Sequence, residues 1–292
     1  MSDSETCRAS RLIINGDDYG KSPEANRAIR RALLEGILTS TTVMANMPYY
    51  GEVAELRATC PLAGIGLHVN LTEGQPVLPP ERVPSLVDRA GNFLSTNTFV
   101  YRVWLGKIDR EHMRAEIEAQ LERLASTVSW VSHLDSHHHI HSRSPHVLDV
   151  MLKVGRAHGV TRIRSNRRFY IDSTARGRGE LHLRLKHFAQ SPTGIAVQPL
   201  NYLQRRRTAD SGFATPDSIL TPIPAIPTGS PEKAAQVWSR VIKHAPSRTF
   251  ELIFHPGGGP QYVGQEELLC HPALRRAVAG LEVQLVNYAN FS

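Results

Sequence analysis

Short apolar runs alternate with amphipathic segments along most of the 292-residue chain, and this alternation constrains the fold more than any other feature. The runs that predict strands are 11–16, 40–46, 63–71, 130–136, 161–165, 249–255 and 281–288. Segments with apolar residues at helical spacing lie at 24–36, 49–60, 110–126, 144–159, 231–245 and 265–280. Strands that alternate with helices indicate a parallel sheet covered by helices. About seven such β-α units in one chain predict an α/β fold, a distorted TIM-like (β/α) barrel.

Residues 165–230 interrupt the alternation. The segment is rich in arginine, proline and glutamine, and its helical pieces at 180–190 and 197–207 have no obvious strand between them. Since it is too long for a plain loop, we interpret it as an irregular excursion that faces the substrate. No internal repeat or low-complexity linker is present, so residues 1–292 are predicted to form a single domain.

Charge and hydropathy limit the partners and the location of the chain. The formal net charge is +7, but arginines are scattered except at Arg205–Arg207, and no RNA- or DNA-binding signature occurs, so no nucleic-acid partner is expected. No apolar run reaches the roughly 18 residues that a transmembrane segment needs. Residues 1–10 are polar and lack the apolar core of a secretion signal, which predicts a cytoplasmic protein. The sequence leaves a homodimer open.

Polar side chains follow several of the predicted strands directly. Parallel strands of a barrel end at one rim, where barrel enzymes build their active sites. The residues that this places together are Asp17, Asp18, His68, Asp135, His137 and His255. The segment "HLDSHHHIH", residues 133–141, belongs to this set and contains five histidines.

Each of these residues also has a simpler interpretation. Two aspartates after a strand are usually a turn or a helix cap, and His68 has an apolar left flank typical of a core histidine. His255 precedes "PGGG" and could be a loop residue, although these glycines would also let a substrate approach the backbone. Buried imidazoles need partners, so the run His137–His141 is harder to explain without a ligand. On an extended chain, alternate histidines of this run would share one face.

Four segments in the same order resemble the motifs of the YdjC-like carbohydrate deacetylases. They are "INGDDYGKSPEANRAIRRALLEGILTSTTVMAN", "GIGLHVNLTEGQPV", "HLDSHHHIH" and "ELIFHPG". The usual "NADDFG" is here "NGDDYG", with Gly16 and Tyr19 in the changed positions and both carboxylates kept. The resemblance fades only between residues 165 and 230.

The resemblance implies a (β/α) barrel that removes the acetyl group from an N-acetylated amino sugar with one divalent metal ion. By motif position, Asp18, His68 and His137 would be the metal ligands, and Asp17 the general base. Two imidazoles and one carboxylate leave coordination positions free for water and substrate, as hydrolysis requires. This ligand set suits Zn²⁺, while the family also permits Mg²⁺.

The remaining candidate residues complete this hypothesis. His255 would donate a proton to the departing amine, and Asp135 would orient a ligand imidazole. His141 and Arg164 would stand behind the ligands or contact the substrate. Two other function classes stay open: another hydrolase on the same barrel, such as a phosphoesterase, and a non-catalytic protein that binds metal or sugar.

Overall fold

The structure is a computed structural model that describes residues 10–174, 179–190, 198–245 and 249–290. Its strands are β1 (Ser10–Tyr19), β2 (Ser40–Val43), β3 (Gly64–Val69), β4 (Leu134–Ser136), β5 (Arg168–Asp172), β6 (Ser218–Ile223), β7 (Thr249–Phe254) and β8 (Val283–Leu285). Its α-helices are α1 (Pro23–Leu34), α2 (Val53–Thr59), α3 (Thr96–Trp104), α4 (Arg110–Val128), α5 (Ile140–Arg143), α6 (Pro145–Ala157), α7 (Glu180–Gln190), α9 (Gln198–Asp210), α10 (Pro231–Lys243), α11 (Gln265–Cys270) and α12 (Pro272–Ala279). Short 3-10 helices are η1 (Tyr50–Glu52), η2 (Pro80–Arg82), η3 (His137–His139) and η4 (Pro260–Tyr262).

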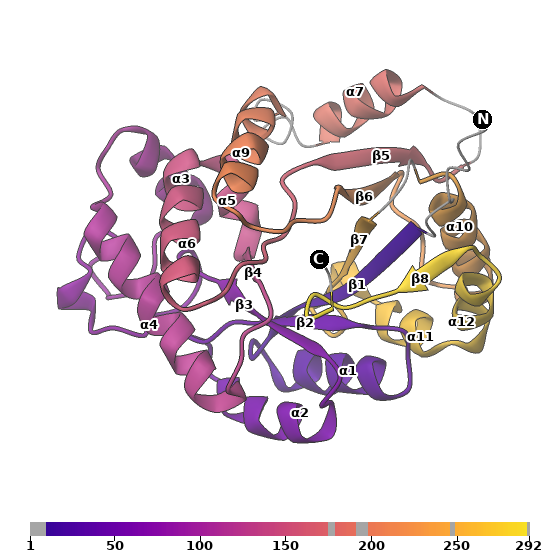
Figure 1. Cartoon of the computed structure of the whole chain (residues 1–292), viewed down its shortest axis with the longest axis horizontal. Coiled ribbons are helices and arrows are strands. Elements are labelled where there is room, and N and C mark those ends of the chain that lie inside the picture. The colour runs from indigo at the N-terminus through magenta and orange to yellow at the C-terminus, as the bar shows by residue number, and fades with distance from the viewer. Residues whose placement is uncertain (1–9, 175–178, 191–197, 246–248, 291–292) are drawn as a thin grey trace, which may run out of the picture.

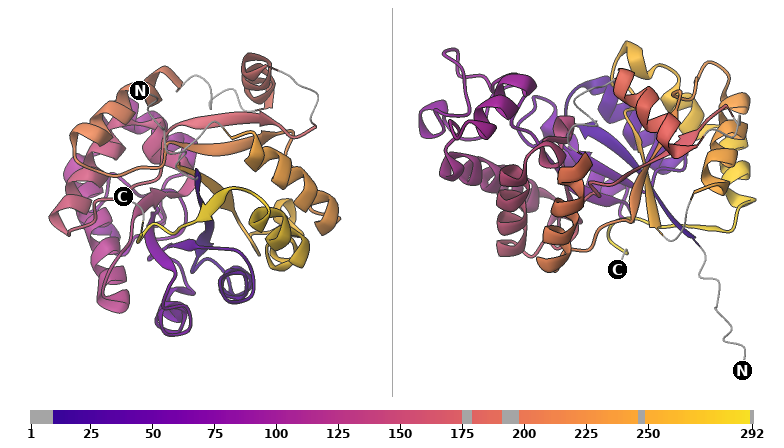
Figure 2. Two further views of the ribbon diagram at one scale, coloured as in Figure 1. Left: turned by 45° about the vertical axis from the view of Figure 1, so that its right-hand side comes forward. Right: turned by 90° about the horizontal axis from the view of Figure 1, so that it is seen from above.

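The strands form one parallel sheet in the order β4-β3-β2-β1-β7-β6-β5, and β8 pairs with the start of β1. Isolated parallel bridges, Leu134 with Ile163 and Arg162 with Ala214, extend the sheet beyond β4 and curl it toward closure. Helices surround the strands on the outside, with α1 and α2, α4 and α6, and α10 and α12 on successive sides (Figures 1 and 2). The predicted α/β class and distorted barrel are confirmed.

Burial explains why the strands read as apolar runs and the helices as amphipathic ones. From Leu12 to Tyr19, β1 is buried at every position, as in a parallel sheet covered on both faces. Helix α1 begins at Pro23 after Ser22, whose hydroxyl accepts a hydrogen bond from the amide of Ala25. Helix α1 therefore begins where the sequence predicts it, just after the strand that carries the twin aspartates.

The structure corrects the prediction in the second half of the barrel. Residues 161–165, predicted as a strand, take part only in the two isolated bridges. Residues 165–230 instead contain two full strands, β5 and β6, which flank helices α7 and α9. Strand β6, with the sequence "SILTPI", contains Pro222. Proline cannot donate a ladder hydrogen bond, so its presence argues against a strand in the sequence.

Among the described residues, no helix is both long enough and apolar enough to cross a membrane. The expectation that the polar N-terminal segment is not a secretion signal rests mainly on residues 1–9. These residues lie outside the part of the chain that the structure describes.

Candidate functional site

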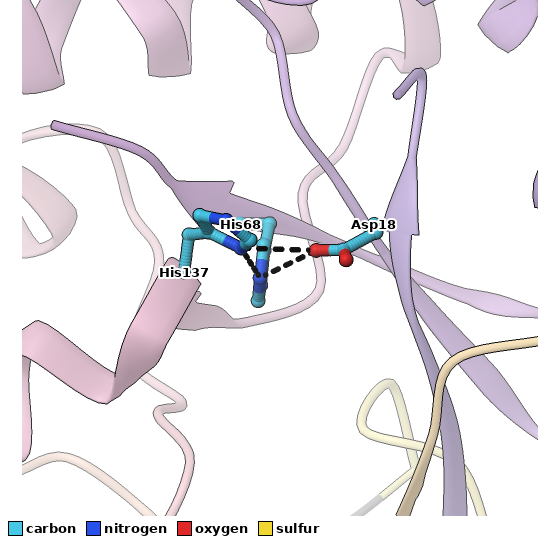
Figure 3. Close-up of side chains that lie close together, drawn as sticks. All are labelled: Asp18, His68 and His137. Carbon is cyan, nitrogen blue, oxygen red and sulfur yellow. Dashed lines mark hydrogen bonds and ion pairs between the residues drawn. The ribbon is translucent and has the colours of Figure 1, made fainter. Parts of the chain in front are cut away.

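Three side chains, one on β1, one on β3 and one directly after β4, meet at the carboxyl ends of these strands (Figure 3). Asp18 Oδ1 lies 3.2 Å from His68 Nε2 and 3.1 Å from His137 Nδ1. The two imidazole nitrogens are 3.3 Å apart. The three atoms therefore form a nearly equilateral triangle, and all three side chains are buried.

The backbone conformation of Asp18, near the end of β1, differs from that of an ordinary strand residue. Asp18 has φ 73°, in the left-handed region that non-glycine residues rarely adopt. Such a conformation is stored strain of the kind that clusters at functional sites. His68 sits within β3 opposite Asp135 of β4, and His137 follows β4 by one residue. The predicted convergence of Asp18, His68 and His137 is thus what the fold produces.

Each imidazole of the triangle has a carboxylate on its other nitrogen. His68 Nδ1 lies 2.7 Å from Asp135 Oδ1, and His137 Nε2 lies 2.8 Å from Glu73 Oε2. A carboxylate behind a histidine fixes the tautomer and ring orientation of a metal ligand. Asp135 was predicted in this role, whereas Glu73 was not predicted at all.

Charge in this cluster favours a cation between the side chains. Burial alone would lower the pKa of His68, but Asp135 and Asp18 outweigh it and raise the pKa to about 10. Burial would raise the pKa of Asp18, yet hydrogen bonding to His137 and His68 holds this pKa well below its usual range. The carboxylates therefore stabilise a positive charge among them, which a proton or a metal cation can supply.

The triangle fits a divalent metal ion. Asp18 Oδ1 is buried and has no hydrogen-bond donor among the described residues apart from the two imidazole nitrogens that face it. Ligand atoms about 2.0–2.1 Å from one ion at tetrahedral angles lie about 3.3–3.4 Å apart, close to the separations found here. A His₂Asp set also leaves positions free for water and substrate. The donor chemistry and the spacing agree.

The carboxylate of Asp17 lies near His68 and Asp135 but does not join the triangle, because Arg164 holds it. The guanidinium donates to both carboxylate oxygens of Asp17 at 2.7 Å. The same guanidinium lies 2.6 Å from Asp135 and donates to Glu251 at 2.8 Å. Burial would raise the pKa of Asp17, but Arg164 outweighs it, so the pKa falls well below its ordinary value. Asp17 is therefore ionised at neutral pH.

Arg164 itself is fully buried, so it lies behind the site and does not reach open solvent. It joins Asp17 to Asp135, the carboxylate behind His68. Of the two roles expected for Arg164, the position behind the ligands agrees with this geometry. Glu251, which Tyr288 also contacts through its hydroxyl at 2.7 Å, was not predicted because it lies inside the run of β7.

His255 follows β7 and faces Asp17. Its Nε2 lies 3.8 Å from Asp17 Oδ2, and its ring stacks on Tyr262 at a centroid distance of 4.4 Å. Burial lowers the pKa of His255 despite the attraction of Asp17. Burial thus outweighs the carboxylate, so the pKa of His255 lies below the ordinary value of a histidine.

Gly257, two residues after His255, serves the fold. Gly257 has φ 73°, and a Cβ there would lie 2.5 Å from the backbone oxygen of Glu24. The loop thus packs directly against the start of α1, which only glycine allows. This packing accounts for Gly257.

The histidine run does not continue as a strand. The chain turns at His138 and His139, which have φ 54° and 51°, and residues 137–139 form the 3-10 helix η3. The prediction that alternate histidines share one face is therefore wrong. His141 is buried on α5, with Nδ1 at 2.5 Å from the hydroxyl of Ser136, and does not belong to the triangle.

Two residues near the triangle were missed by the sequence reasoning. Glu73 lies on the loop after β3, and Lys21 Nζ contacts it at 2.9 Å while lying 3.8 Å from Asp18. The hydrogen bond from His137, together with Lys21, lowers the pKa of Glu73 to about 2. In the sequence, only its position five residues after His68 pointed to Glu73. It lies in a loop, where no helical or strand spacing predicts the direction of a side chain.

Comparisons with known proteins identify the family of this chain. A family model described as "YdjC-like protein" matches residues 11–281. Two proteins named carbohydrate deacetylase are each 37% identical to this chain. The one from Thermoanaerobacter pseudethanolicus matches over 143 residues and the one from Enterococcus faecalis V583 over 149 residues. These matches cover 49% and 50% of this chain and 55% of each relative, so the chain spans about half the length of the curated relatives it matches.

A solved structure covers nearly the whole chain. It is the crystal structure of an Enterococcus faecalis V583 protein named for cellobiose-phosphate cleavage, with a TM-score of 0.72 and 26% identity. The match covers 96% of this chain and 97% of that one.

Proposed function

Because this chain belongs to the YdjC-like protein family, we propose that it is a metal-dependent carbohydrate deacetylase that hydrolyses the acetamide of an N-acetylated amino sugar. The observation that carries the proposal is the triangle of Asp18, His68 and His137 beside an ionised Asp17. Relatives that bear the name carbohydrate deacetylase support the substrate class.

Asp18, His68 and His137 would hold one divalent ion, Zn²⁺ or Mg²⁺. When bound, such an ion supplies Lewis acidity toward water and toward the acetamide carbonyl. Asp135 and Glu73 would keep the two imidazoles in the tautomer and orientation that ligation needs. These carboxylates also compensate the charge of a buried cation.

Asp17 would act as the general base. It is adjacent to Asp18 in sequence, yet its carboxylate is held by Arg164 instead of joining the triangle. The low pKa keeps Asp17 in the ionised form that a general base needs across the whole neutral range. Arg164 would fix its position, because two parallel hydrogen bonds allow the carboxylate little rotation.

His255 would carry a proton to the departing amine. The lowered pKa means that its ring is neutral before reaction, so it must first receive a proton. Asp17 is the neighbouring donor, since its Oδ2 lies 3.8 Å from Nε2 of His255. We therefore place His255 as a shuttle that takes the proton collected by Asp17 and passes it to the nitrogen. An amine departs readily only when it is protonated.

The test is release of acetate from defined substrates. Metal-loaded protein would be incubated with a panel of N-acetylated sugars and, in parallel, with generic phosphoesters. We expect acetate from at least one sugar, and loss of release after chelation and in Asp17→Asn. Phosphoester hydrolysis without acetate would favour a phosphoesterase instead. Sugar and metal binding without any turnover would indicate a non-catalytic binder.

A further inference from the structure

Tyr288 enters the barrel from the amino ends of its strands, opposite the end that carries the triangle. After β8 the chain runs back across the starts of β1 and β2 (Figure 1). There the amide of Val286 donates to the carbonyl of Leu12, and the amide of Tyr288 donates to the hydroxyl of Ser40, the first residue of β2. The side chain of Tyr288 is fully buried. Its hydroxyl therefore lies inside the barrel, beneath the candidate site.

The ring of Tyr288 is held by stacking. It lies nearly parallel to the ring of His133, at a centroid distance of 3.6 Å. His133 in turn packs against the backbone of β3, where a Cβ at Gly66 would overlap its ring. With the ring held in this way, the hydroxyl donates to Oε2 of Glu251 at 2.7 Å.

Glu251 connects this hydroxyl to Arg164. Its Oε1 accepts hydrogen bonds from Nε of Arg164 at 3.0 Å and from Nη2 at 2.8 Å. The other N–H groups of the guanidinium face Asp17 and Asp135. All five donors of the guanidinium thus have a carboxylate oxygen opposite them, and Glu251 accepts two of these five. Glu251 therefore fixes the orientation in which the guanidinium meets Asp17.

The hydroxyl of Tyr288 also favours the charged form of Glu251. Burial raises the pKa of Glu251, whereas Arg164 and the hydrogen bond from Tyr288 oppose this effect. Loss of the hydroxyl would therefore favour the protonated carboxyl group, which binds a guanidinium less strongly than a carboxylate does.

We infer that Tyr288 is a positioning residue for the general base, and that it acts on Asp17 through Glu251 and Arg164. The inference rests on the proposed deacetylase function, in which Asp17 is that base. Arg164 holds Asp17 by two parallel hydrogen bonds of 2.7 Å, so a rotation of the guanidinium moves the carboxylate. A displacement of about 1 Å in a reacting group can cost about a hundredfold in rate.

The first test is Tyr288→Phe, which keeps the ring on His133 and removes only the hydroxyl. We expect kcat for acetate release to fall at least about tenfold with little change in KM, because the general base acts in the chemical step. Metal affinity should equal that of the wild type. Weaker metal binding that accounts for the loss would place the effect on Asp135 and His68, and would overturn the assignment to Asp17.

The matched control is Tyr50→Phe. It also removes the hydroxyl of a buried tyrosine, but this hydroxyl donates to the backbone oxygen of Arg123 on α4 at 2.6 Å. Both variants should lose some stability, and Tyr50→Phe should keep the kcat of the wild type. Equal losses of kcat in the two variants would reduce the effect of Tyr288 to general destabilisation and overturn the inference.

A double-mutant cycle tests whether the effect passes through Asp17. If it does, Tyr288→Phe should change the residual rate of Asp17→Asn by less than about twofold, because the group that Tyr288 positions is already gone. A tenfold fall that persists in the Asp17→Asn background would overturn the inference.

A further test does not depend on turnover. The Nε–H group of Arg164 would be followed by NMR, with its resonance assigned through bonds from the backbone, and its hydrogen exchange measured in the metal-loaded protein. Exchange should be at least about tenfold faster in Tyr288→Phe than in the wild type and Tyr50→Phe, since Glu251 then holds this group less tightly.

The outcomes separate the two proposals. Unchanged exchange in Tyr288→Phe, or faster exchange with an undiminished kcat, would overturn the positioning role. Faster exchange in Tyr288→Phe, in a protein that releases acetate from none of the sugars, would reject the proposed function but keep the control of Arg164 and Asp17 by Tyr288. Circular dichroism would confirm that the variants are folded.

Discussion

Oε2 of Glu73 lies 2.8 Å from Nε2 of His137, while Nδ1 of the same ring faces Asp18 at 3.1 Å. His68 has the same arrangement, with Asp135 behind it and Asp18 in front. Both imidazoles of the triangle are thus held between two carboxylates. The one behind His137, Glu73, has a side chain that is 34% exposed and comes from a loop, so it can be changed with less disturbance of the core than Asp135.

The first prediction concerns Glu73→Gln. An amide cannot supply the negative charge that holds the proton of His137 on Nε2, so Nδ1 becomes a poorer ligand. We expect about 10- to 100-fold weaker metal affinity, the usual effect of removing such a partner. Competition with a chromophoric chelator would measure it. Glu81→Gln, an exposed residue of η2, is the control and should bind like the wild type. Equal affinity in Glu73→Gln would contradict the orienting role.

The second prediction identifies the ligands. His68→Ala and His137→Ala should each lose metal and activity together, since each removes one of three donors. His138→Ala is the matched control, because His138 is exposed and its Nδ1 lies 2.7 Å from Thr96 Oγ1 instead. Metal content after dialysis would be measured by elemental analysis. Glu73, His137 and His138 form a second cluster with suitable spacing, so loss of metal in His138→Ala but not in His68→Ala would place the ion there.

Sequence alone could predict the residues that stand at strand ends, because parallel strands of a barrel must end at one rim. Asp18, His68 and His137 were found in this way. It could not predict Glu73, which reaches His137 from an irregular loop, nor the path of His138 and His139, whose left-handed backbone has no signal in a run of identical residues.

The second half of the barrel was harder for a different reason. Strand β5 begins with an arginine and β6 contains a proline, so neither shows an uninterrupted apolar run. Residues 165–230 therefore read as an excursion although they supply two strands of the sheet. Replacing this segment with a linker would remove both strands, so its role in substrate choice must be tested by single substitutions such as Arg168→Gln.

The third prediction separates the twin aspartates. Asp17→Asn should keep its metal yet lose activity by about a hundredfold or more, as loss of a general base commonly causes. Asp18→Asn should instead weaken metal binding, because Asp18 Oδ1 is the carboxylate oxygen of the triangle. Metal affinity and acetate release would be measured for both variants in parallel. Indistinguishable metal affinities would refute this division of roles.

The fourth prediction concerns stability and pH. Glu116 is buried in α4, where it accepts hydrogen bonds from the amides of Val77 and Leu78 and from Gln120. Burial raises the pKa of Glu116, and these hydrogen bonds only partly offset it. The folded state then binds the proton more tightly than the unfolded state. This contribution to stability is complete below the unfolded pKa of about 4.3 and is lost as pH rises through the higher folded pKa.

Glu116→Gln removes this titration. Its free energy of unfolding, relative to the wild type, should therefore increase from about pH 4 toward neutrality and then level off. Urea unfolding at a series of pH values would measure the difference. Glu122→Gln, an exposed position of the same helix, controls for the loss of one charge. A difference that stays constant or decreases with pH would show that burial does not govern this carboxyl group.

The last prediction is that His255→Ala keeps its metal and loses deacetylation, because no other imidazole among the described residues lies within ion-pair distance of Asp17. The loss should depend on the leaving group. An amine needs a proton from His255, whereas the phenolate of an activated acetate ester departs without one. We therefore expect hydrolysis of the amide to fall at least about tenfold further than hydrolysis of the ester. His244→Ala, which removes an exposed histidine after α10, should change neither rate. Equal losses for amide and ester would instead make His255 a residue that positions the substrate, since a proton donor must discriminate between the two leaving groups.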